Sequence, residues 1–151
     1  MQVSPLAVVV LVSSGMVAGV LFAVALSVVP ALMAMPADRY LYTTNLLGRN
    51  WDPVMPILVL GTAAGDLALA LMPGPQSARV LYGATVVLMI AVAGVSHLCN
   101  VPINRILKKI DPNAIPDDWA DPRPRWRSWH LLRTTLAVAA LTANSLAVAM
   151  S

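Results

Sequence analysis

The sequence predicts an all-α integral membrane protein, one domain over residues 1–151 that folds as a bundle of four membrane-spanning helices. Composition is the first reason, because 58% of the residues are hydrophobic and 11% are charged, against about 45–50% and about 25% in soluble domains. Charge distribution is the second, since every charged residue lies between Asp38 and Arg133. The third is the presence of four apolar segments of about the 20 residues that a spanning helix needs.

The four predicted helices cover residues 6–33, 53–72, 80–99 and 129–150. Strands of a membrane barrel would be about 10 residues long with alternating polarity, and these segments lack that alternation. The first segment differs from a secretory signal peptide, because no basic residue precedes it and its apolar run is about twice the usual length. We therefore expect it to be retained as a spanning helix.

The connections between these helices differ in character. Residues 72–77, Met-Pro-Gly-Pro-Gln-Ser, predict a tight turn, whereas residues 34–52 form a longer polar loop. Residues 100–128 contain five prolines and most of the charge, and Pro102 is expected to bend or restart the helix. A short interfacial helix is predicted after it, with an apolar face opposite a basic one: Ile103, Ile106, Leu107 and Ile110 against Arg105, Lys108 and Lys109.

The Lys and Arg residues predict the orientation in the membrane. The two long loops hold Arg39, Arg49 and six further basic residues, and Arg133 lies just inside the fourth helix, whereas the opposite side holds only Arg79. The positive-inside rule then places both long loops in the cytoplasm and both termini outside, in a bacterial inner membrane. The lipid bilayer is the expected partner, and homo-oligomer formation is left open.

Several classes of function find little support. The net charge of +3 is too small and too clustered to predict nucleic-acid binding, and the one Cys, Cys99, excludes an internal disulfide. No Gly-rich loop leads into a helix with a following Lys, as a phosphate cradle requires. A transporter would need a polar path through the membrane and usually an inverted repeat, and the chain shows little of either.

Polar and aromatic residues gather where the first helix ends, the second begins, the third ends and the fourth begins. Ionisable side chains at membrane depth are costly and usually face a bundle interior or a cavity. Three of the residues, His97, Asn100 and Asn104, follow the i, i+3, i+7 spacing of one helical stripe. An ordinary headgroup rim of Trp and Arg is the alternative interpretation. The full set is Asn50, Trp51, Asp52, His97, Asn100, Asn104, Trp126, Trp129, His130 and Arg133.

Side-chain chemistry assigns candidate roles to this set. His97 and His130 are candidates for acid or base catalysis near neutral pH, Arg133 would stabilise an anionic phenolate or enolate, and Asp52 completes the catalytic candidates. The amides would hydrogen-bond carbonyl or hydroxyl groups and the indoles would stack on a flat aromatic ring. These substrate-binding candidates are Asn50, Asn100, Asn104, Trp51, Trp126 and Trp129.

The two histidines also leave open a metal site. With Asp52 or Cys99, His97 and His130 would offer ligands suited to copper or iron. No His-x-x-x-His or Cys-x-x-Cys spacing occurs in the chain. The alternative is a His pair that orders the rim or binds substrate.

One acidic residue lies much deeper in the predicted bundle. Asp66 and Asn144 follow Pro53 and His130 by 13 and 14 residues, which places both roughly 20 Å from the cytoplasmic ends at the rise of a helix. Thr85 reaches a similar depth. We expect Asp66 to be protonated or hydrogen-bonded to Asn144 or Thr85, as a structural interhelical contact or as part of a proton relay or substrate contact.

Two short motifs carry a family resemblance. Residues 100–107, Asn-Val-Pro-Ile-Asn-Arg-Ile-Leu, resemble an Asn-x-Pro-Leu-Asn-x-x-Leu pattern that closes a third helix, and residues 126–134 resemble a Trp-x-x-Trp-Asn-His-x-Arg-Thr pattern that opens a fourth. With residues 50–53 and 61–63, they resemble over nearly the whole chain the anthrone oxygenase-like family of small four-helix membrane proteins. The chain departs from the pattern where His130 directly follows Trp129, and His97 and Asp66 lie outside it.

The resemblance implies, for some members, oxidation of anthrones to anthraquinones with molecular oxygen in polyketide pathways. We therefore predict a membrane-embedded oxygenase or oxidase, a monooxygenase-type oxidoreductase of secondary metabolism, that acts on a lipophilic aromatic or polyketide-like small molecule. Molecular oxygen is its expected co-substrate, and metal dependence stays open. The alternatives are a structural or accessory membrane subunit and a lipophile-binding protein without turnover.

Overall fold

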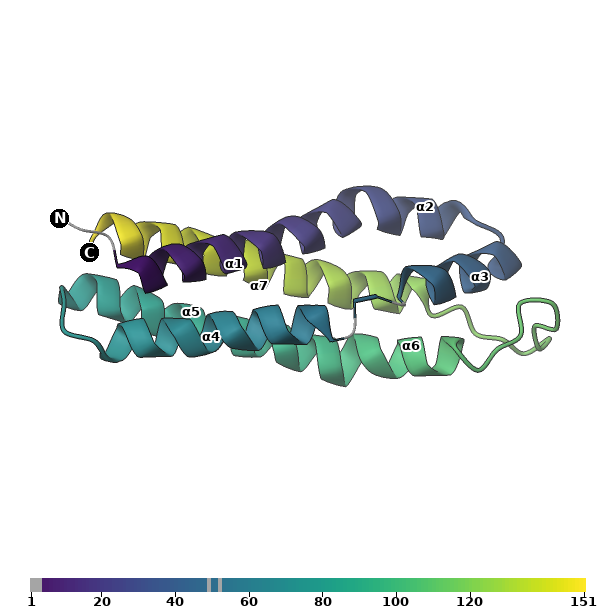
Figure 1. Ribbon diagram of the computed structural model, residues 1–151. Coiled ribbons are helices and arrows are strands. Elements are labelled where there is room, and N and C mark those ends of the chain that lie inside the picture. Colours follow the sequence, from purple (N-terminus) through teal and green to yellow (C-terminus); the bar gives the residue numbers. More distant parts are fainter. Residues whose placement is uncertain (1–3, 49, 52) are drawn as a thin grey trace.

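A computed structural model describes residues 4–48, 50–51 and 53–151 as an elongated bundle of helices (Figure 1). Four stretches of helix are long and apolar enough to cross a membrane, Pro5–Ala34, Val54–Leu71, Gln76–Leu107 and Arg123–Ala149. Large apolar side chains cover their outer faces, such as Ile57, which is 66% exposed, and Val87, which is 69% exposed. The chain is an integral membrane protein, and the predicted four-helix bundle is confirmed.

The first span consists of three joined segments. Helix α1 (Pro5–Ala23) continues through a π-helical segment, η1 (Val24–Val28), into α2 (Val29–Ala34). A further helix, α3 (Ala37–Leu47), then turns back beside α2 (Figure 1), in a segment for which the sequence predicted a polar loop. Asp38 in its first turn suits a helix N-terminus, and burial of Tyr40 and Leu41 gives the helix a packed face.

The third span is longer than predicted. Helices α4 (Val54–Leu71) and α5 (Gln76–Val95) are joined by the expected turn, and α5 continues through a second π-helical segment, η2 (Ser96–Asn100), into α6 (Val101–Leu107). Pro102 does not separate α6 from this span, because the helix continues through it, with the π-helical segment directly before.

The predicted interfacial helix is therefore the end of the third span. Its residues Ile103 and Leu107 are buried against Leu32, Tyr40 and Leu41 in a loop-end cluster. Ile106, from the same predicted apolar face, is 61% exposed. The apolar face thus packs mainly against α2 and α3.

The fourth span, α7 (Arg123–Ala149), begins six residues before the predicted start at Trp129. Pro124 lies in its first turn, a position that proline favours. The Asp121 carboxylate accepts a hydrogen bond of 3.0 Å from the Arg123 backbone N–H, which satisfies one of the free N–H groups at a helix start. Pro124 and Asp121 therefore allow the helix to begin before its apolar part.

The bundle has two distinct ends (Figure 1). The chain ends and the α4–α5 turn lie at one, here named the termini end, and α3, α6 and residues 108–122 lie at the other, the loop end. This is the predicted topology. Between the ends lie two apolar clusters. The central cluster is Val17, Ala18, Leu21, Val59, Ala63, Met89, Val92, Ala137 and Ala140, and the termini-end cluster is Ala7, Val10, Leu69, Ala78, Tyr82 and Ala147.

Candidate functional site

His130 lies in the loop-end part of α7 and is fully buried. Its Nε2 is 3.0 Å from the carbonyl oxygen of Leu21, while its Nδ1 accepts hydrogen bonds from Arg133 Nε at 3.1 Å and from Arg133 Nη2 at 2.9 Å. A carbonyl oxygen can only accept and a guanidinium can only donate. The proton therefore sits on Nε2, and His130 is a neutral imidazole with both nitrogens engaged.

Arg133 is a half-buried cation held by neutral groups. Besides His130, it donates from Nη1 to Ser96 Oγ at 3.3 Å, and its guanidinium carbon lies 5.6 Å from the centre of the Trp126 ring. These contacts use three of the five N–H groups of a guanidinium. In the described part of the chain no carboxylate pairs with Arg133, and two N–H groups of its guanidinium have no partner there.

Trp126 connects this pair to the third span. Its ring is stacked on His130, with centroids 5.0 Å apart and an angle of 4° between the planes. The indole Nε1 donates to Asn104 Oδ1 at 2.9 Å, and Asn100 Nδ2 donates to the Trp126 carbonyl oxygen at 3.2 Å. The two predicted asparagines therefore hold Trp126, which in turn packs on the imidazole that binds Arg133.

Both π-helical segments adjoin this cluster. Segment η2 provides Ser96 and Asn100, and η1 begins three residues after Leu21. A π-helical turn contains an extra residue, and such turns occur frequently at functional sites. The inward stripe runs through Ser96, Asn100 and Ile103, which continue the spacing of the buried Met89 and Val92, whereas His97 is exposed. The predicted stripe of His97, Asn100 and Asn104 is therefore wrong at His97, and Ser96 was missed.

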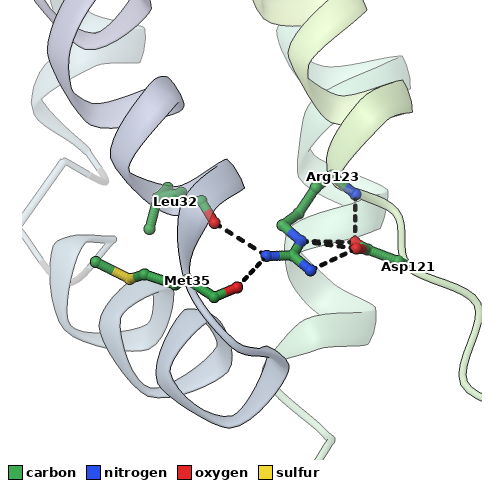
Figure 2. A network of polar contacts seen from close by, with 4 residues as sticks. All are labelled: Leu32, Met35, Asp121 and Arg123. Carbon is green, nitrogen blue, oxygen red and sulfur yellow. Dashed lines mark hydrogen bonds and ion pairs between the residues drawn. The ribbon is translucent and has the colours of Figure 1, made fainter.

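A second polar network fixes the start of α7 to the end of α2 (Figure 2). Arg123 donates from Nη1 to the carbonyl oxygens of Leu32 at 3.1 Å and Met35 at 2.6 Å, and from Nε to both Asp121 oxygens at 2.9 and 2.7 Å. Arg123 thus gives a charged donor to two carbonyls at a helix end, of which that of Leu32 also accepts from the Met35 N–H at 3.4 Å. Sequence reasoning counted it only as loop charge.

Electrostatic effects follow from this network. The hydrogen bonds from Arg123 lower the pKa of the Asp121 carboxyl. Burial, and then the negative charge of Asp121, raise the pKa of the Tyr40 phenol to about 12, so Tyr40 is neutral at physiological pH. The Arg123 guanidinium carbon lies 5.0 Å from the centre of the Tyr40 ring.

A small cavity separates the two networks. It has a volume of about 20 Å³ and is lined by residues of α2, α3 and α7, including Tyr40, Thr44, Arg123 and Trp126. This is room for about one water molecule. A larger open groove of about 550 Å³ lies outside, at the corner between α2 and α3.

The other predicted site residues lie apart from the cluster or outside the description. Asn50 and Trp51 are exposed. Trp129 is half-buried against the loop-end cluster, and its Nε1 has no partner among residues 4–48, 50–51 and 53–151. Asp52 lies outside the described residues, so its predicted role stays a prediction.

The donor set for a metal does not assemble in the described part of the chain. No group of three His, Cys, Asp or Glu side chains there could hold an ion. His97 is exposed, while His130 is buried with both ring nitrogens engaged. As arranged, His130 has no free ring nitrogen for a copper or iron ion, and Asp52 lies outside the described residues, so the metal site stays a prediction.

A family model described as Anthrone oxygenase matches residues 46–143. The chain belongs to the anthrone oxygenase family. The matched segment holds every side chain of the cluster described above, from Ser96 to Arg133, and confirms the family resemblance of the two motifs. Neither a curated protein nor a solved structure matches the chain. The family is therefore established, and the substrate of this member is a matter for proposal.

Proposed function

We propose that this protein is an oxygenase that oxidises a lipophilic aromatic small molecule with molecular oxygen at the loop end of the bundle. The observation that carries the proposal is Arg133, a half-buried guanidinium whose described partners are the neutral atoms His130 Nδ1 and Ser96 Oγ. Such a cation attracts an anion, and charge-assisted hydrogen bonds are the strong ones. Family membership supports the reaction class.

The substrate class that suits this site is an anthrone-type ring system. Its CH₂ group readily loses a proton to water, because the negative charge moves onto the ketone oxygen and gives an aromatic oxyanion. This electron-rich anion reacts with molecular oxygen. Overall the CH₂ carbon loses two hydrogens and gains one oxygen atom, and the second oxygen atom leaves as water. Arg133 would stabilise the oxyanion through its two remaining N–H groups.

His130 has a positioning role in this proposal. Its Nδ1 lone pair is directed at Arg133 and its Nε2 proton at the Leu21 carbonyl oxygen, so the imidazole orients the guanidinium and accepts no substrate proton in this arrangement. Trp126, held by Asn100 and Asn104, offers an aromatic face on the same cluster. An aromatic ring would stack there while its oxyanion contacts Arg133.

The substrate needs more room than the closed structure offers. Pockets for drug-sized ligands have volumes of about 300–1,000 Å³, against about 20 Å³ for the cavity beside Trp126. Helix α3 covers that cavity with Tyr40 and Thr44. In the proposal, α3 moves away from α2 and α7 to admit a substrate dissolved in the bilayer.

Oxygen uptake tests the proposal. The purified protein in lipid nanodiscs is supplied with anthrone, and uptake is compared for the wild type, Arg133→Gln and the control Arg127→Gln, whose arginine is exposed on the same helix. Arg127→Gln should retain the wild-type rate. Arg133→Gln should lose about 10²–10³-fold, the effect typical of an oxyanion contact.

Two results would count against the proposal. Equal rates in the wild type and Arg133→Gln would remove the role of the guanidinium. Anthrone binding by folded wild-type protein without oxygen uptake would instead identify a lipophile-binding protein, and absence of both binding and uptake would exclude this substrate class. Quenching of tryptophan fluorescence by the ligand reports binding, because Trp126 lies in the site.

A further inference from the structure

Four fully buried polar side chains form a layer across the bundle, one from each spanning helix. Each is 0% exposed: Ser14 of α1, Asp66 of α4, Thr85 of α5 and Asn144 of α7. Along its own helix, each lies between a residue of the central cluster and one of the termini-end cluster. On α4, for example, Asp66 lies between Ala63 and Leu69. A polar layer is therefore enclosed between two apolar ones.

Most polar atoms of this layer lack a partner among the described residues. These atoms are both Asp66 carboxyl oxygens, both Asn144 amide atoms and Ser14 Oγ, together with the buried hydroxyl of Tyr82 one turn toward the termini end. Asn144 lies close to the Asp66 carboxyl, although their atoms form no hydrogen bond of standard geometry. Polar groups in a membrane interior must be satisfied within the protein, so this layer is suited to a small polar guest.

The donors in the layer indicate which guest it suits. Asn144 offers two N–H groups, and Ser14 and Tyr82 each offer an O–H group, so four donors accompany the Asp66 carboxyl. A metal cation would offer these hydrogens no acceptor, whereas a water molecule both donates and accepts. Thr85 already donates to the Leu81 carbonyl oxygen at 3.1 Å, and its oxygen can still accept.

The charges around Asp66 leave a proton as the neutralising cation. Helix α1 carries no charged residue, α7 carries none between Arg133 and its C-terminal end, and α4 carries none besides Asp66. On α5, Arg79 is exposed at the termini end and donates to the Ala70 carbonyl oxygen at 2.9 Å. Tyr82 is then the other titratable side chain that faces the layer from the described part of the packed helices.

We propose that this layer is a proton-binding site, in which the Asp66 carboxyl binds a proton together with water held by Ser14, Tyr82 and Asn144, and which exchanges with the termini end of the bundle only. A proton from water at that end joins a carboxylate oxygen of Asp66 and leaves by the same route. This inference is independent of the proposed oxygenase function.

The depth of the layer supports exchange with one end. Asp66 lies five residues before the end of α4 and Tyr82 lies six residues after the start of α5, so the termini-end cluster separates the layer from that end by only about 8–9 Å along the helix axis. This cluster includes Tyr82, whose hydroxyl has no partner among the described residues. Asn144 and His130 are 14 residues apart on α7, or roughly 21 Å, and the apolar central cluster fills this interval. The layer is thus separated from the Arg133 cluster.

Infrared spectroscopy of the full chain in sealed lipid vesicles tests the site. The wild type is compared with Asp66→Asn and with the control Asp38→Asn, which removes an exposed carboxyl at the loop end. We expect the carbonyl band of a buried carboxylic acid in the wild type and in Asp38→Asn, and its loss in Asp66→Asn. The band should shift in heavy water, because the site exchanges protons.

A pH step on one side of the vesicle tests the direction of exchange. Raising the pH on the termini side should weaken the band, the same step on the loop side should leave it unchanged, and Tyr82→Phe should slow the response. Three results would overturn the proposal. They are a band that persists in Asp66→Asn, a band that changes with neither heavy water nor pH, and a band that responds equally to a pH step on the loop side. If Asp66→Asn fails to fold, the response of the wild-type band to heavy water and to the pH steps decides whether the proposal holds.

Discussion

Two substitutions of His130 separate a positioning role from a base in the proposed reaction. In His130→Asn, the carboxamide oxygen is bonded to Cγ, as Nδ1 is, and can still accept a hydrogen bond from Arg133. In His130→Gln, the amide N–H extends toward the Nε2 position and can still donate to the Leu21 carbonyl oxygen, but the Nδ1 acceptor is lost. Neither amide accepts a proton at neutral pH.

The structure provides the expected magnitudes. Nδ1 receives two of the three hydrogen bonds of Arg133, and a hydrogen bond to a charged group contributes about 1.5–3 kcal/mol. Since about 1.4 kcal/mol changes a rate tenfold, kcat in His130→Gln should fall about 10- to 100-fold. His130→Asn loses the Leu21 contact and the stack on Trp126, worth about 1–3 kcal/mol of stability, and should retain kcat within about tenfold.

Steady-state oxygen uptake with anthrone measures kcat and KM for both variants, and circular dichroism during heating verifies that each is folded at the assay temperature. A positioning role predicts that the two variants differ in kcat, with His130→Asn the more active. Equal losses in both, with the wild-type rate falling at acidic pH on a single His titration, would show that His130 is the base and would refute this reasoning.

Three further predictions concern stability, measured as thermal unfolding in detergent. Arg123→Ala should cost about 2 kcal/mol, because two carbonyls at the end of α2 lose a charged donor, whereas the exposed neighbour Arg125→Ala should cost almost nothing. Gly65→Ala should cost about 1–3 kcal/mol, since its Cβ would lie 2.5 Å from a methyl of Val10, while Gly61→Ala meets no atom within 4 Å and should be neutral or stabilising. Asp121 has a lowered pKa in the folded protein, so its carboxylate stabilises the fold above the unfolded-state pKa of about 3.9. This stabilisation is lost as the pH falls through the folded-state pKa. The unfolding temperature should therefore drop more at low pH in the wild type than in Asp121→Asn.

Hydropathy was sufficient to predict the spans, because lipid contact selects long apolar helices whatever their neighbours. Helix α3 was not predicted, since it is amphipathic and its buried face, Tyr40 and Leu41, packs against distant residues such as Leu107. The start of α7 was placed too late for a related reason. Its first turns are polar, and Asp121 and Pro124 define them through local capping.

Prediction of the site depended on helical periodicity. On α7 the regular 3.6-residue period holds, and His130, Ala137, Ala140 and Asn144 are buried on one stripe. On the third span the buried positions Met89, Val92, Asn100, Ile103 and Leu107 keep the same period. This period includes Ser96, which contacts Arg133, and leaves out His97, which is exposed. The error came from starting the stripe at His97 rather than extending it from Val92 through Pro102, where the helix continues.

The central claim is that Arg133 binds the anionic form of an aromatic substrate. The absorption spectrum of a bound hydroxyanthraquinone tests it most directly, because the phenol and phenolate forms of this ligand differ in colour. At a pH where the free ligand is a neutral phenol, the wild-type protein should bind it as the phenolate, and Arg133→Gln should bind it as the phenol. A ligand that is neutral in both proteins, with equal affinity, would contradict the claim.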